Sequence, residues 1–176
     1  MAEPTNINRY VTGHDENGHA IFSFEGSVPY TKVLEKSGKN ALFGVPWKTD
    51  SFPSECNGKE DAAVIGGPLH NDEGTLCRVV EFPPNTSSPF HRTCSLDYGI
   101  LVSGEMHLEL DDGHTRKFVQ GDVAVQRGTM HAWHNRTNEY ARMIFVLVAA
   151  KPTVINGKVL EDAMIRDTPL YEDGSY

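Results

Sequence analysis

Histidine is the side chain best suited to moving protons or binding a metal at neutral pH, and this chain has eight of them. Three offer little chemistry, because His14 and His114 lie in turns beside Asp and Gly, and His19 opens a short N-terminal segment. Four others lie in or beside regularly spaced apolar segments: His91, His107, His131 and His134. His70 lies upstream, in a loop rich in Gly and Pro that could cover one end of the fold.

The elements that position these histidines are predicted to be β-strands. From residue 75 onward, short apolar runs alternate with turn residues, and Met106, Leu108 and Leu110 fall on one face of their segment. Strands at such short and even spacing are typical of an antiparallel sandwich or barrel. The expected strand segments are 75–82, 97–103, 105–110, 115–119, 123–126, 130–135 and 140–149.

The chain is expected to form one domain with three parts. Residues 1–74 are an N-terminal extension whose β-hairpin, segments 9–12 and 19–24, packs on the barrel. Residues 75–150 are the barrel itself. Residues 151–176 are a C-terminal part with a hairpin turn at 155–158, one helical turn at 160–164 and a polar tail at 171–176.

Two segments carry a resemblance to a known family. Residues 89–104 are similar to the first cupin motif, and residues 121–135 are similar to the second, with fitting order and separation. The chain therefore resembles the cupin superfamily, in particular small single-domain cupins of fungi and bacteria that carry His-Arg-Thr-x-Ser-Leu-Asp-Tyr-Gly. The resemblance implies an all-β fold, the cupin double-stranded β-helix or jelly-roll barrel, here with an N-terminal strand extension.

The resemblance also implies a site inside the barrel at His91, Asp97 and His131, as catalytic residues, as metal ligands, or as both. Two imidazoles and one carboxylate form a facial triad for a divalent metal such as Fe, Zn, Mn or Ni. Residue 93 shares the inward face with His91, but it is Thr93 where the family has a second His, and Asp97 stands where the family has Glu. A metal-free site is the alternative, in which His131 or His91 is the general acid or base and Asp97 fixes its tautomer.

Further residues are expected to contact a small-molecule substrate. His134 alternates away from His131 and is expected on the outer face. His107 faces the cavity if Met106 and Leu108 pack outward. The full set of expected substrate contacts is Thr93, Tyr98, His107, Arg127, Met130 and Trp133.

Three classes of function remain open. The first is lyase or isomerase chemistry, such as dehydration or decarboxylation, on an oxygenated polyketide-like or aromatic substrate of secondary metabolism. The second is an Fe(II)-dependent dioxygenase, and the third is a non-catalytic ligand-binding barrel. Cupins host all of these activities, so the fold does not choose among them.

Composition and charge limit the kinds of partner that the protein can be expected to bind. The net charge is −8, from 24 acidic and 16 basic residues, which disfavours a nucleic-acid partner. The first residues do not resemble a secretion signal and no apolar run reaches membrane-spanning length, so we expect a cytoplasmic protein without a membrane partner. The three cysteines are expected to be reduced thiols. The family resemblance implies a homodimer.

Overall fold

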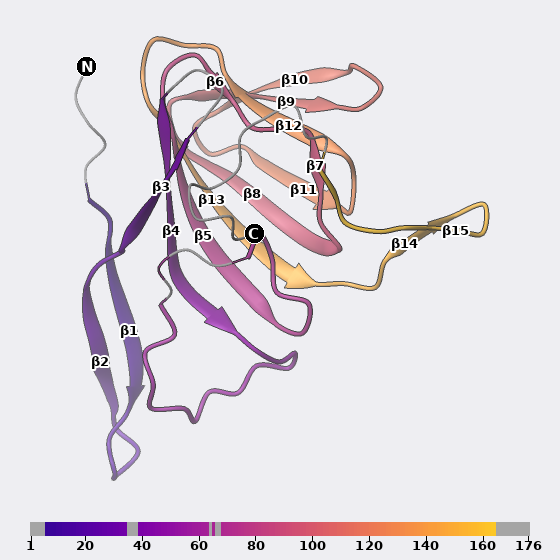
Figure 1. The fold of residues 1–176 in the computed structure, drawn as a ribbon. Coiled ribbons are helices and arrows are strands. Elements are labelled where there is room, and N and C mark those ends of the chain that lie inside the picture. The colour runs from indigo at the N-terminus through magenta and orange to yellow at the C-terminus, as the bar shows by residue number, and fades with distance from the viewer. Residues whose placement is uncertain (1–5, 35–38, 64, 66–67, 165–176) are drawn as a thin grey trace.

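The computed structural model describes residues 6–34, 39–63, 65 and 68–164, and within these ranges the chain is built of β-strands without a helix. None of the described segments is therefore a helix that could cross a membrane. Most strands belong to two six-stranded antiparallel sheets, which Figure 1 shows wrapped into one body with two hairpins projecting from it. This confirms the all-β cupin barrel predicted from the sequence.

The first sheet has the order β10-β9-β12-β7-β16, and β6 also pairs with β12. Its strands are β6 (Thr86–Ser87), β7 (His91–Arg92), β9 (Glu105–Leu110), β10 (Thr115–Val119), β12 (His131–Asn135) and β16 (Ala163–Met164). The second sheet has the order β11-β8-β13-β5-β4-β3. Its strands are β3 (Tyr30–Leu34), β4 (Asn40–Thr49), β5 (Thr75–Phe82), β8 (Ser95–Ser103), β11 (Val123–Arg127) and β13 (Ala141–Ala149).

The two hairpins form separate sheets. One consists of β1 (Asn8–His14) and β2 (Ala20–Ser27), and the other of β14 (Thr153–Ile155) and β15 (Lys158–Leu160). The second hairpin has its turn where the sequence predicts it. Asn156 and Gly157 both have positive φ, 49° and 77°, the conformation that tight two-residue hairpin turns require.

Alternation along the strands decides which side chains enter the barrel. On β11, Ala124 and Gln126 are buried, whereas Val123, Val125 and Arg127 are exposed. β8 behaves in the same way, with its odd-numbered residues from 95 to 101 buried. A period of two in burial is what a strand with one face toward a core produces.

The strand register divides the interior into an apolar and a polar end. Asp97 pairs with Gln126 on one side and with Leu147 on the other, and further along β8, Leu101 pairs with Met143. The apolar end is a packed cluster of Val80, Phe82, Leu101, Met106, Ala124, Trp133, Ala141 and Met143. Trp133 lies at the boundary, with the rings of Phe118 and Phe145 edge-on at 5.1 and 5.9 Å.

Two sequence-based expectations about organisation need correction. The boundary at residue 74 does not separate extension from barrel, because β3 and β4 belong to the second sheet and β4 pairs directly with β5. The helical turn expected at 160–164 is wrong: Ala163 and Met164 pair with Arg92 and His91 of β7, where the backbone finds sheet hydrogen bonds instead. The polar tail at 171–176 lies outside the described residues.

Asn135 fastens the end of β12 to the neighbouring chain segments. Its buried Nδ2 lies 3.0 Å from the carbonyl oxygens of Phe82 and Pro83 and 2.8 Å from that of Glu139. Its Oδ1 accepts hydrogen bonds from the backbone N–H and the hydroxyl of Thr137. We predict that Asn135→Ala lowers the free energy of unfolding by about 3 kcal/mol, because it leaves buried carbonyls unpaired. Urea denaturation measures the change.

A matched control is Asn138→Ala. Asn138 is exposed, and its side chain accepts one hydrogen bond from the exposed Asn85 at 3.2 Å. The control should change the free energy of unfolding by less than about 0.5 kcal/mol. Equal losses of unfolding free energy in the two variants would show that the buried hydrogen bonds of Asn135 contribute no more to stability than one hydrogen bond at the surface.

Candidate functional site

A group of polar side chains occupies the polar end of the barrel interior. Asp97 comes from β8, Gln126 from the paired position on β11, and His131 from the start of β12. Their exposed fractions are 3%, 4% and 2%. His91 of β7 is paired with His131 in the sheet and is part-buried, and their ring centroids are 4.4 Å apart. The structure thus brings together the three residues named from the sequence, and adds a fourth.

Gln126 is the centre of this group. Its Nε2 lies 2.8 Å from Nε2 of His131 and 3.3 Å from Oδ2 of Asp97. Its Oε1 accepts a hydrogen bond from the indole Nε1–H of Trp133 at 3.0 Å. An indole nitrogen can only donate, so the amide oxygen must face Trp133 and the amide nitrogen must face the other two residues. Both amide hydrogens are therefore used, one on each neighbour.

The hydrogen-bond partners of its two ring nitrogens fix the tautomer of His131. Nδ1 lies 2.9 Å from the carbonyl oxygen of Thr129, which can only accept, so Nδ1 carries the proton. Nε2 then accepts from Gln126. Burial, together with the neighbouring His91, lowers the pKa of His131 to about 3, while the Thr129 carbonyl acts in the opposite direction. His131 is a neutral imidazole with both nitrogens occupied.

His91 has the same tautomer as His131, but only one of its ring nitrogens has a hydrogen-bond partner among the described residues. Its Nδ1 lies 3.0 Å from the carbonyl oxygen of Pro89, which places the lone pair on Nε2. Burial lowers its pKa, and the positive charge of Arg78 adds to that effect, while the Pro89 carbonyl opposes it. Among the residues that the structure describes, no hydrogen bond reaches Nε2 of His91. This nitrogen is the free base of the site.

Asp97 is a buried carboxyl surrounded by donors. The hydroxyl of Ser95 lies 2.5 Å from Oδ1, and that of Thr93 lies 3.5 Å from Oδ2, where Gln126 also donates. Burial raises the pKa of Asp97, while these hydrogen bonds and the charge of His70 lower it. These three donors hold the carboxyl in place, and each of its oxygens accepts at least one hydrogen bond.

The arrangement does not fit a single metal ion held jointly by His91, Asp97 and His131. The amide N–H groups of Gln126 lie against the lone pairs that His131 and Asp97 would offer to the ion. Within the described ranges, three metal-ligand side chains come within 4.8 Å of one another only at His70, Asp72 and Asp162. In this arrangement Gln126 occupies one ligand atom of His131 and one of Asp97, and metal binding by the triad stays a prediction.

Three of the expected substrate contacts are corrected by the structure. Tyr98 and Arg127 are exposed, because they alternate with the buried Asp97 and Gln126 and so lie on the outer face. His107 lies on the outer face too, since Met106 is buried in the core and His107 pairs across the sheet with His134.

The other three expected contacts lie at or near the interior. Thr93 is buried beside Asp97, and Trp133 is buried between the core cluster and Gln126. Met130 is part-buried next to His131 in sequence. Their contact with substrate stays a prediction.

Sequence reasoning missed two interior residues. Gln126 is a polar residue that follows three apolar residues, Val123 to Val125, and takes the same inward face as Ala124; this polar residue on the inward face was the available signal. Arg78 interrupts β5 in the same way: it is buried, its Cζ lies 5.3 Å from the ring centroid of Phe43, and its charge acts on His91. A buried cation beside a neutral base is a feature of sites that bind oxyanions.

The depressed pKa of His131 predicts a pH-dependent stability. Below pH 6.5 the unfolded chain takes up a proton on this residue that the folded chain, with a pKa of about 3, does not. The free energy of unfolding should therefore fall from about pH 6.5 toward pH 3, by up to about 1.4 kcal/mol per pH unit from His131. His131→Gln should flatten this slope in urea denaturation, whereas His114→Gln, at an exposed turn, should not. Identical slopes for His131→Gln and the unmodified chain would contradict a neutral buried His131.

Comparison with known proteins agrees with the fold. The cupin-domain family model matches residues 78–147. A cupin-domain-containing oxidoreductase of Hypocrea virens, virC, is 40% identical over 154 residues, which are 84% of this chain and 78% of that protein. Phomopsin biosynthesis cluster protein D of Diaporthe leptostromiformis is 36% identical, over 87% of this chain and 84% of its own.

A third sequence relative matches most of the chain, and one solved structure aligns with part of it. Oryzines biosynthesis cluster protein J of Aspergillus oryzae is 32% identical, over 90% of this chain and 91% of its own. A Klebsiella pneumoniae protein with a double-stranded β-helix domain aligns with a TM-score of 0.49 and 15% identity, over 72% of this chain and 85% of its own. On the family match and these sequence relatives, the chain belongs to the cupin superfamily.

Proposed function

We propose that the chain is a biosynthetic enzyme that binds a small oxygenated molecule at the polar end of its barrel and moves a proton on it. The support for biosynthesis is that relatives covering most of the chain are named as members of the phomopsin and oryzines biosynthesis clusters. The proposed chemistry is of the lyase or isomerase type, a dehydration, a decarboxylation or a double-bond shift.

The observation that carries the chemistry is the unequal state of the two histidines. Both are neutral, but His131 has its lone pair bound by Gln126, whereas Nε2 of His91 is unpaired within the described residues. Of the two histidines that the sequence analysis left open as general acid or base, His91 is therefore the proposed base. His131, Gln126 and Asp97 form a rigid polar wall that orients the substrate.

The proposed step balances without a further reactant. His91 Nε2 takes a proton from a carbon next to a carbonyl, and the C–H electron pair moves into the enolate, whose negative oxygen is stabilised by Arg78. The enolate then expels a hydroxyl group on the neighbouring carbon, and His91 returns its proton to the leaving oxygen as water departs. In an isomerisation, the proton returns to a different carbon.

A second candidate function is a metal-dependent oxidoreductase, the class that includes the Fe(II) dioxygenase expected as the alternative. The observation that favours it is that the relative virC is named a cupin-domain-containing oxidoreductase. The difference in atomic composition between substrate and product distinguishes the two candidate functions. A strain that lacks the gene should accumulate a substrate that differs from the product by one water, by one carbon dioxide or by no atoms at all. A product that gains both atoms of dioxygen would establish the oxygenase instead.

We predict that His91→Gln lowers turnover of that accumulated substrate by at least about 100-fold, because the variant has no base at this position. The Gln side chain is close in size, and its amide can keep the bond to the Pro89 carbonyl. His134→Gln is the matched control, because His134 lies on the outer face between Ser87 and Glu109 and should keep full turnover. Turnover retained in His91→Gln, or lost equally in both variants, would reject His91 as the base.

We also propose that the protein is a homodimer that buries the outer face of β8 and β11. Val125 is 56% exposed and pairs across the sheet with the exposed Tyr98, and Val123 beside them is 53% exposed. Valine side chains at this exposure gain free energy when a partner covers them. Light scattering at micromolar concentration should give twice the monomer mass for the unmodified chain and the monomer mass for Val125→Glu. A monomeric unmodified chain would contradict the proposal.

A further inference from the structure

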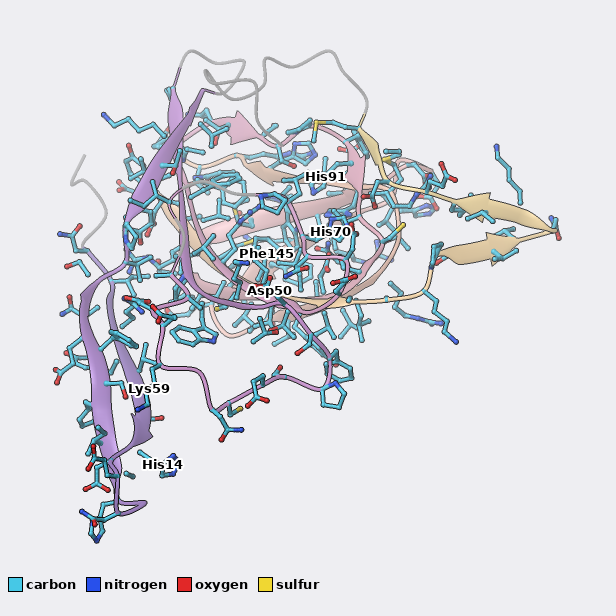
Figure 2. All side chains as sticks on the ribbon, turned by 60° about the horizontal axis from the view of Figure 1, so that its bottom comes forward. His14, Asp50, Lys59, His70, His91 and Phe145 are labelled. Atoms are coloured by element: carbon cyan, nitrogen blue, oxygen red, sulfur yellow. The ribbon has the colours of Figure 1, made fainter. Side chains whose placement is uncertain are left out.

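A second cluster of metal-ligand side chains shares no residue with the His91–His131 pair. His70 and Asp72 come from the segment that leads into β5, and Asp162 comes from the connection between β15 and β16. Nε2 of His70 lies 2.9 Å from Oδ1 of Asp72 and 3.5 Å from Oδ2 of Asp162. The three ligand atoms lie within 4.8 Å of one another. Figure 2 draws His70 within the outline of the barrel, unlike His14 on the projecting hairpin.

His70 is the informative member of this cluster. Its side chain is only 9% exposed, and its Nε2 is buried and makes no hydrogen bond, although two carboxylate oxygens lie nearby. The distance to Asp72 is short enough for a hydrogen bond, so the angle is what fails. Ligands of a shared ion point at the ion and not at one another. A buried imidazole nitrogen that lies close to carboxylates but is not aimed at either of them is the geometry expected around a cation.

The separations also suit a metal ion. Ligand atoms about 2.0–2.1 Å from a tetrahedral zinc ion lie about 3.3 Å apart, and the two His70–Asp distances fall on either side of that value. One imidazole and two carboxylates supply two negative charges, which a divalent cation neutralises. Imidazole with carboxylates is a donor set for first-row transition metals.

Asp162 is already held in the orientation that binding needs. Its Oδ1 accepts the backbone N–H of Cys94 at 2.6 Å, which leaves Oδ2 as the oxygen nearest to His70. Asp72 and Asp162 are 85% and 52% exposed, so an ion can enter from solvent and keep water in its open positions. Three protein ligands with an open position is the pattern of reactive rather than purely structural zinc sites.

We propose that His70, Asp72 and Asp162 form a site for one divalent transition-metal ion. The ion links the segment before β5 to the segment before β16, next to the polar end of the barrel. The site is electrostatically coupled to the interior, because the charge of His70 acts on Asp97. The proposal is independent of proton transfer by His91, because it uses none of the same side chains.

The test is calorimetric titration of Zn²⁺ into the untagged, chelator-treated full chain. We expect one ion per chain and a rise in the thermal unfolding midpoint when Zn²⁺ is added. Asp162→Asn should weaken Zn²⁺ affinity at least tenfold and remove the rise. This variant keeps Oδ1 for the Cys94 N–H and replaces only the ligand oxygen Oδ2 with an amide nitrogen. Asp72→Asn, at an exposed position, should weaken binding in the same way and serves if Asp162→Asn fails to fold.

Two further variants separate this site from other places where zinc could bind. His114→Gln removes a His–Asp pair of similar spacing, 2.8 Å, that is exposed and outside the cluster, so affinity should be unchanged. His91→Gln should also leave affinity unchanged. The proposal is overturned if the unmodified chain binds no stoichiometric Zn²⁺. It is equally overturned if the Asp72 and Asp162 variants bind like the unmodified chain, or if His91→Gln is the variant that loses the ion.

Discussion

The side chain of Gln126 uses its one acceptor and both of its amide hydrogens inside the barrel, and the rest of the site depends on how it does so. Trp133 can only donate, so it determines which end of the amide faces the apolar core. The other end must then donate to His131 and to Asp97. A single indole N–H thus sets the polarity of the hydrogen bonds that two other side chains receive.

This constraint explains the division of labour in the interior. Trp133 belongs to the apolar cluster and contacts the amide of Gln126, and the buried groups on the other side of this amide are polar. With its lone pair bound, His131 is a fixed neutral element and not a titrating one. Chemistry is left to His91, whose ring packs against that of His131 at 4.4 Å and whose Nε2 is unpaired in the described structure, and to the cation of Arg78.

The sequence contained the barrel, the hairpin turn at Asn156 and Gly157, and the grouping of His91, Asp97 and His131, because alternation and motif spacing are local signals. The outward direction of Tyr98 follows by alternation from the inward Asp97 and could have been predicted, whereas the directions of Arg127 and His107 depend on which faces of β11 and β9 the partner strands bury. The proximity of His70 and Asp162 could not be predicted either, because it brings together two irregular segments that are far apart in the chain. Gln126 was visible as a polar break in β11, but its partners depend on strand pairing.

Gln126 holds His131 as a neutral imidazole protonated on Nδ1, and ¹⁵N NMR of the histidine rings tests this state directly. An ordinary imidazole is mostly charged by about pH 5. We predict that His131 remains neutral at that pH with its proton on Nδ1, and that Gln126→Leu changes this state. A His131 resonance that reports an imidazolium at about pH 5, or a neutral ring protonated on Nε2, would contradict the claim.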